Sequence, residues 1–135
     1  MSNSKLNLSD IYERSVDEIA QHLECAVAFL CEYESLKSQN ISLLDEHYDD
    51  IVRTQDCFRS SISKAYHISY AFQSVFFGSE YFVRLHTIYD WSFQLYLSID
   101  VFSSVDHYKN LITCVAANSR NGTLETPPSK LKEAA

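Results

Sequence analysis

The stretch SDIYERSVDEIAQHLECAVAFLCEYESLK, residues 9–37, decides the fold class. Its apolar side chains recur at alternating spacings of four and three residues, which is the pattern of one buried face of a long helix. Ser9, Asp10 and Glu13 form a capping-box signal at its start. We therefore predict one helix over residues 9–37. The predicted buried seam is Tyr12, Val16, Ile19, Leu23, Ala26, Leu30 and Tyr33.

A second helical seam runs from Ile41 to Phe76 in the same spacing. Gln55 and Ser69 occupy core positions of this seam, where a polar residue either fixes the register of packing or is merely peripheral. Helix propensity is weakest at residues 59–61, so the second helix either kinks or breaks there or continues through. Gly78 is the expected end of this helical run.

A third seam runs from Tyr81 to Phe102 behind a cap at Ser79, and a shorter fourth one ends near Asn118. The third helix is apolar nearly all round, which is typical of a central helix buried on two sides. Both prolines lie within the last nine residues, and short polar breaks separate the seams. The predicted fold is all-α, an antiparallel bundle of three long helices plus a short fourth. Residues 1–119 form one helical-bundle domain, and residues 120–135 are expected to be a disordered, flexible polar tail.

The chain is acidic, with a net charge of −7, and residues 1–60 hold 12 acidic and 5 basic side chains. Excess negative charge disfavours direct binding of nucleic acid and suits a partner protein with a basic surface. The densest acidic run supplies the predicted partner-binding residues, which are Asp45, Glu46, Tyr48, Asp49 and Asp50. The alternative is a solvated acidic face at a helix start, where the helix dipole favours negative charge.

Aromatic residues are unevenly distributed, because 12 of the 18 lie between Tyr66 and Phe102. They form an ordinary core, a self-association surface or a small-molecule pocket. The long seams and the third helix together offer more apolar surface than a short fourth helix covers, so we predict a homodimer. The predicted self-association residues are Tyr81, Phe82, Tyr89, Phe93 and Tyr96.

No set of catalytic or metal-binding residues is complete. His86 and Asp90 share one helical face but lack further ligands, so neither a metal site nor a cofactor is expected. His67 lies, like His86, in apolar sequence surroundings, which favours satisfied core histidines over catalytic bases. The four cysteines form no zinc-binding or disulfide pattern, and buried free thiols are expected at Cys25, Cys31, Cys57 and Cys114.

These observations lead to three hypotheses of function. The first is a non-enzymatic protein-binding module, a small acidic inhibitor, antitoxin or immunity-type protein that docks on a basic partner. The second is a structural or regulatory homo-oligomer built through the seams and the aromatic third helix. The third is a small helical ligand-binding protein or enzyme that uses the aromatic centre. No stretch is long and apolar enough for a membrane span, and the start lacks a secretion signal, so a cytoplasmic location without membrane partners is expected.

Overall fold

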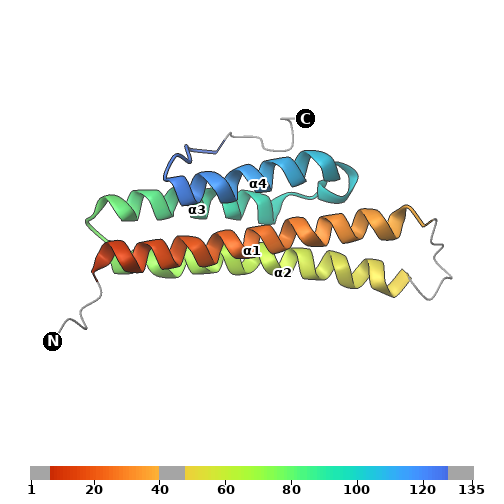
Figure 1. Cartoon of the computed structure of the whole chain (residues 1–135), viewed down its shortest axis with the longest axis horizontal. Coiled ribbons are helices and arrows are strands. Elements are labelled where there is room, and N and C mark those ends of the chain that lie inside the picture. The colour runs from red at the N-terminus through yellow and green to blue at the C-terminus, as the bar shows by residue number, and fades with distance from the viewer. Residues whose placement is uncertain (1–6, 40–47, 128–135) are drawn as a thin grey trace.

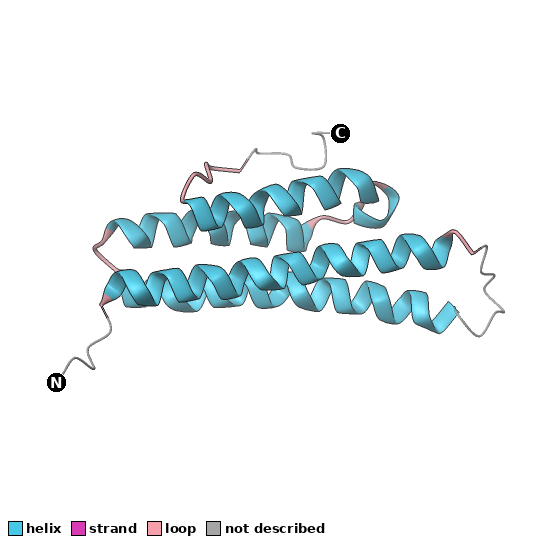
Figure 2. Ribbon diagram, in the orientation of Figure 1, coloured by secondary structure: helices cyan, strands magenta, loops and turns pink. Residues whose placement is uncertain are grey.

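The computed structural model describes residues 7–39 and 48–127 of the chain. The described elements are helices α1 (Leu8–Lys37), α2 (Tyr48–Gln73), α3 (Glu80–Leu97) and α4 (Val105–Asn121), with short 3-10 turns at Ser74–Phe76 and Val101–Ser103. These residues contain no strand (Figure 2). The prediction of an all-α fold is therefore confirmed.

Successive helices run in opposite directions, as the colour gradient in Figure 1 shows. Helix α1 packs against both α2 and α4, whereas α3 packs mainly against α2. The α1–α2 hairpin is longer than the α3–α4 hairpin and projects beyond it at one end (Figure 1). The antiparallel connection predicted from the short breaks is confirmed. The expected central position of α3 is not, because α1 and α2 each pack against two helices and α3 packs mainly against one.

The α1 seam is buried along its whole length, and each of its seven predicted residues is at most 7 % exposed. The predicted boundaries are also correct to within one residue. The predicted cap was wrong, because the N-cap is Asn7 and not Ser9 or Asp10. The Asn7 Oδ1 atom accepts a hydrogen bond from the backbone N–H of Asp10 at 2.8 Å, so Ser9 and Asp10 already belong to the first turn.

Helix α2 runs without a break from Tyr48 to Gln73, so of the two alternatives at residues 59–61 the helix continues through. Tertiary packing overrides the weak local propensity there, since Ser61 and Ile62 are both buried. Of the two polar seam residues, Gln55 is half-buried, whereas Ser69 is fully buried and its hydroxyl donates to the Tyr66 carbonyl at 2.9 Å. The start of the second seam, residues 41–47, lies outside the described residues.

The turn from α2 to α3 follows the glycine signal in the sequence. Gly78 has a φ of +86°, a conformation that a side chain would strain. Ser79 is the N-cap residue of α3, as predicted, but its hydroxyl donates back to the Phe76 carbonyl at 2.8 Å instead of capping α3.

Helix α3 is shorter than predicted, because it ends at Leu97. Ile99, expected in the buried seam, is 82 % exposed. The Ser98 hydroxyl donates to the Gln94 carbonyl at 3.0 Å. Serine and aspartate side chains compete with the backbone for such hydrogen bonds, so Ser98 and Asp100 favour the end of the helix at this point. The described bundle therefore has two long and two shorter helices, where the sequence predicted three long ones and one short one.

Helix α4 continues past residue 119 and ends in a Schellman motif at Gly122, which has a φ of +71°. The Thr123 N–H donates to the Asn118 carbonyl at 3.0 Å, as this motif requires. Beyond it, Leu124 packs on the core, and the Trp91 indole donates to the Glu125 carbonyl. The described segment 122–127 is thus attached to α3, so the disordered tail expected from residue 120 does not include these residues. Residues 128–135 lie outside the described residues.

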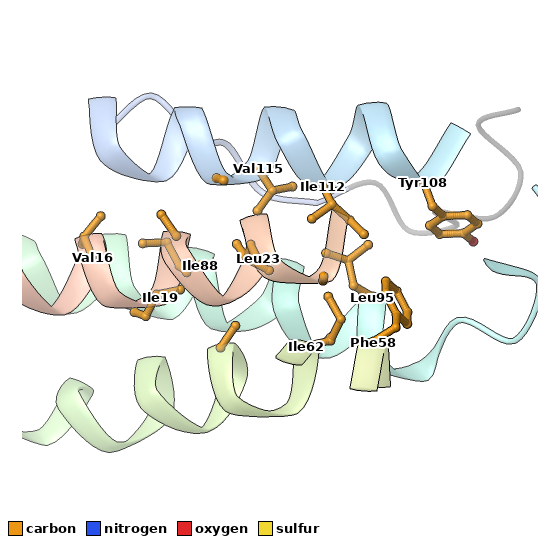
Figure 3. Packing of buried hydrophobic residues seen from close by; sticks show 14 of the residues in the cluster. Val16, Ile19, Leu23, Phe58, Ile62, Ile88, Leu95, Tyr108, Ile112 and Val115 are labelled. Atoms are coloured by element: carbon orange, nitrogen blue, oxygen red, sulfur yellow. The ribbon is translucent and has the colours of Figure 1, made fainter. Parts of the chain in front are cut away.

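All four helices contribute to one hydrophobic core (Figure 3). Ile19 and Leu23 of α1 meet side chains of the other three helices there, among them Ile62, Ile88 and Ile112. Within residues 7–39 and 48–127, no helix combines the length and the hydropathy that crossing a membrane requires.

Candidate protein-binding surface

Aromatic rings of α2, of α3 and of the turn that joins them gather along the outer side of the groove between these two helices. We call this surface the aromatic face. It consists of Tyr66, Tyr70, Phe77, Phe82, Tyr89, Phe93 and Tyr96. In α3, ring spacings of three, four and seven residues place Phe82, Tyr89, Phe93 and Tyr96 along one stripe. In α2, Tyr66 and Tyr70 are one turn apart and meet that stripe from the other side.

The rings form a continuous network rather than isolated pairs. The Tyr66 ring centroid lies 5.3 Å from that of Phe93 and 5.1 Å from that of Tyr96. The Tyr70 and Tyr89 centroids are 5.6 Å apart, and Tyr89 stacks on Phe93 at 5.7 Å. Each such contact stabilises by about 0.5–1.5 kcal/mol beyond the area it buries. The network therefore fixes the orientation of the rings before any partner arrives.

Much of this aromatic surface is open to solvent. Phe77 is 77 % exposed, Tyr70 is 65 % exposed and Tyr96 is 41 % exposed. The other four rings are half-buried. Single exposed apolar residues are ordinary, but contiguous exposed rings mark binding surfaces. Tyrosine and phenylalanine are also the residues that interface centres favour.

A shallow groove of about 460 Å³ opens at one end of the aromatic face, between the end of α2 and the start of α3. Tyr70, Phe77 and Phe82 provide its aromatic walls, and Gln73 and Ser74 provide polar groups. The Gln73 Nε2 atom is buried without a hydrogen-bond partner among the described residues. The exposed rim of rings suits contact with a side chain or loop of a partner protein.

Two histidines belong to this side of the molecule, and both are exposed. The His86 ring lies between Phe82 and Tyr89, with Nδ1 3.3 Å from Gln73 Oε1 and Nε2 3.6 Å from Asp90 Oδ2. The His67 Nδ1 atom lies 2.8 Å from the Ser63 carbonyl. The expectation that His67 and His86 are core histidines was wrong, because both occupy helix positions outside the buried seams.

Four of the five predicted self-association residues lie on the aromatic face, and Tyr81 does not. Tyr81 stacks on Tyr12 of α1 with ring centroids 4.5 Å apart and contacts Phe76 edge-on. The Arg84 guanidinium lies about 6 Å from both tyrosine rings. Sequence reasoning missed Tyr66, Tyr70 and Phe77, although the four-residue spacing of the two tyrosines was a usable signal.

The predicted acidic docking site is only partly described. Asp45 and Glu46 lie outside the described residues. Tyr48 is 38 % exposed, so it does not continue the buried seam as expected, and Asp49 is exposed beside it. Asp50 is half-buried and pairs with Arg53 at 2.6 Å. The charge of this helix start is therefore partly balanced within α2 itself.

Carboxylates of α1 are engaged by α4. The Arg120 guanidinium contacts Asp17 at 3.1 Å and also pairs with Glu24. Lys109 pairs with Glu34 at 2.5 Å, which raises the pKa of the Lys109 ammonium. Asp10, Glu13 and Glu18 remain on the exposed side of α1. The acidic side of the bundle is thus α1 near its N-terminus, away from the aromatic face.

The four cysteines are free, as predicted, but they are not buried. Cys25, Cys31 and Cys114 are exposed, and Cys57 is half-buried. They occupy helix positions that face away from the seams. Among the residues that the structure describes, no three histidine, cysteine, aspartate or glutamate side chains gather as ligands for a metal ion.

No protein-family model matches the chain, and neither the curated proteins nor the solved structures contain a significant match to it.

Proposed function

We propose that this chain is a non-enzymatic protein-binding module and that the aromatic face is its docking surface. The observation that carries the proposal is the contiguous network of rings in which Tyr70 and Phe77 are mostly exposed. Stiff aromatic side chains lose little conformational entropy on binding, because neighbouring rings already orient them. A partner protein that covers them would bury a large apolar area.

A protein partner fits this surface better than a small molecule does. The groove beside Tyr70 and Phe77 is open, whereas a small-molecule site usually encloses most of its ligand. The rings instead extend along the length of α3 as a strip, from Phe82 to Tyr96. A strip of rings along two neighbouring helices can receive a helix of a partner protein.

In its more specific form, the proposal is a small acidic inhibitor, antitoxin or immunity-type protein that docks on a basic partner. The net charge of −7 and the exposed carboxylates of Asp10, Glu13 and Asp49 support it. Such charges raise the rate of encounter with a basic protein over a distance set by the ionic strength. The acidic side of α1 and the aromatic face are separate surfaces, so one chain can hold a basic partner and an apolar one.

Paired capture experiments test the docking surface. A tagged wild-type chain, a Tyr70→Ser/Phe77→Ser variant and a Val52→Ser control are presented to the same cell extract. Val52 is 37 % exposed on α2, so it matches the exposed apolar character of the test positions. We expect a protein retained by the wild type and the control but lost by the double variant. Identical retention by all three baits would contradict the proposal.

The acidic form of the proposal has its own measurement. Replacing Asp49 by Asn should slow association with a captured basic partner several-fold at low salt and leave dissociation nearly unchanged. Asp49 is the cleaner choice because Asp50 is engaged with Arg53. Thr126→Val, an exposed uncharged change, serves as the control. Equal association rates for Asp49→Asn and the wild type would remove Asp49 from the docking surface.

A further inference from the structure

We infer that a second copy of this chain occupies the aromatic face, in a two-fold symmetric dimer. This inference rests on the proposed function, because it takes the aromatic face as a docking surface and names its partner. In a two-fold dimer the same patch of each subunit meets its counterpart. The patch must therefore be complementary to itself in both shape and charge.

Charge distribution selects the aromatic face for this contact. A chain of net charge −7 repels its own copy wherever unbalanced carboxylates would meet, and the exposed side of α1 carries Asp10, Glu13 and Glu18. On the aromatic face the carboxylate of Asp90 has a counter-charge available, because its Oδ2 atom lies 3.6 Å from His86 Nε2. Tyrosine hydroxyls both donate and accept hydrogen bonds, so two identical tyrosine-rich faces can satisfy one another.

The same charge distribution argues against a basic partner at this face. A basic surface placed over the rings would lose hydration of its cations and find few carboxylates to pair with. Nucleic acid is disfavoured by the negative charge of the chain as a whole. The described C-terminal segment does not cover the face either, since it is bound to Trp91 on another side of α3.

The size of the aromatic face fits a dimer of moderate affinity. Helix α3 has 18 residues, so the face is roughly 27 Å long. Two adjacent helices give a width of about 20 Å, hence about 500 Å² in projection and more as accessible surface. Stable interfaces bury about 800 Å² per partner, so the dimer lies near the lower end of this class. We therefore expect dissociation constants of the order of micromolar.

The test is the mass of the full chain in solution, measured by light scattering and sedimentation from low micromolar to submillimolar concentration. For the wild type we expect a concentration-dependent rise from 15.5 kDa to twice that mass. Tyr70→Ser/Phe77→Ser should weaken the dimer at least about ten-fold, because exposed aromatic anchors dominate interface energy. Val52→Ser should dimerise like the wild type. Circular dichroism verifies that each variant is folded.

A second variant covers the case in which the double variant does not fold. Tyr70→Glu introduces a single charge at a largely exposed position, and a two-fold dimer would bring two such charges into one interface. We expect it to remain monomeric at concentrations where the wild type dimerises. If added salt restores part of the dimer, the repulsion is electrostatic, as the symmetric arrangement requires.

The outcomes separate this inference from the proposed function. Suppose that the wild type stays monomeric and that Tyr70→Ser/Phe77→Ser still loses the captured protein. The inference of a dimer is then overturned, but the aromatic face remains a docking surface for another protein. A wild-type dimer that Tyr70→Ser/Phe77→Ser and Tyr70→Glu leave intact places the dimer interface elsewhere and also overturns the inference. If the wild type is monomeric and the aromatic substitutions do not change which proteins it captures, both the dimer inference and the proposed docking surface are overturned.

Discussion

Tyr108 links the hydrophobic core to the turn between α3 and α4. Its ring is fully buried, and its hydroxyl donates to the Asp100 Oδ1 atom at 2.6 Å. Replacing Tyr108 by Phe keeps the ring and removes this bond, so we expect a loss of about 1–3 kcal/mol in the free energy of unfolding. Urea titration measures it, with Tyr48→Phe, at an exposed ring outside the aromatic face, as the control. Equal stability of Tyr108→Phe and the wild type would show that the hydrogen bond contributes nothing.

Buried tyrosine hydroxyls also make stability depend on alkaline pH. Burial raises the pKa of Tyr108, where the bond to Asp100 adds to the effect, and it raises the pKa of Tyr12, where Arg84 opposes it. Above a pH of about 10 an unfolded tyrosine loses its proton while the folded one keeps it. The unfolded state then binds fewer protons, so stability falls as pH rises.

We therefore expect the free energy of unfolding to decline from a pH of about 10 upward, with Lys109 acting in the same direction through its raised pKa. Tyr108→Phe should decline less steeply than the wild type, because one titrating hydroxyl has been removed. Urea titrations at a series of alkaline pH values compare the two slopes. Parallel curves would mean that Tyr108 titrates alike in the folded and unfolded states.

At the scale of the elements, the C-terminal segment 122–127 can be followed through Trp91, the only tryptophan of the chain. The half-buried Leu124 side chain and the bond from the Trp91 indole to the Glu125 carbonyl hold this segment against the bundle. Leu124→Ala removes the apolar contact and should cost about 1–2 kcal/mol. It should also shift Trp91 emission to longer wavelength, because water gains access to the indole.

A chain that ends at Asn121 should show the same shift in emission as Leu124→Ala, since both release the segment. Thr126→Ala, at an exposed position of the same segment, should leave emission and stability unchanged. Emission of Leu124→Ala that coincides with the wild type would mean that the segment does not shield Trp91.

Helix periodicity predicted the buried side of each element better than its ends. The α1 seam was predicted residue by residue, because a regular spacing over 30 residues averages out local exceptions. The ends of α1 and α3 depend on single side chains such as Asn7 and Ser98. The spacing of apolar residues does not predict the hydrogen bonds that these side chains form. The attachment of segment 122–127 was missed for a similar reason. Its composition is mostly polar, and the contact depends on the single leucine at position 124.

The aromatic face was only half predictable. Its α3 stripe follows from periodicity, but Tyr66 and Tyr70 join it only because α2 packs beside α3 in this register. Tyr81, which has the same sequence character, turns toward Tyr12 because α1 lies on that side of α3. Which neighbour a ring meets is a property of the assembled bundle, so spacing within one helix cannot assign it.

At the scale of the described bundle, the ion pairs between α1 and α4 and the aromatic face lie on different helix pairs. Arg120 and Lys109 of α4 bind carboxylates of α1, which joins these helices through ion pairs at their outer edges. The aromatic face lies on the α2–α3 side. Exposed ion pairs contribute little to stability, so the shared core has to hold the two hairpins together. That core includes Leu23 of α1 and Ile88 of α3.

A shared core predicts that both hairpins unfold together. Circular dichroism reports mainly on the long helices α1 and α2, whereas Trp91 fluorescence reports on α3 and its attached segment. The stability of a dimer depends on protein concentration, so both signals are recorded at one fixed concentration. They should then give the same urea midpoint. Leu23→Ala at a fully buried position should lower both midpoints equally and cost about 2–5 kcal/mol. Thr113→Ala, on the exposed side of α4, is the control. If Leu23→Ala moved the circular dichroism midpoint but left the Trp91 midpoint in place, α3 would be stable without α1, and the chain would hold two cooperative units instead of one.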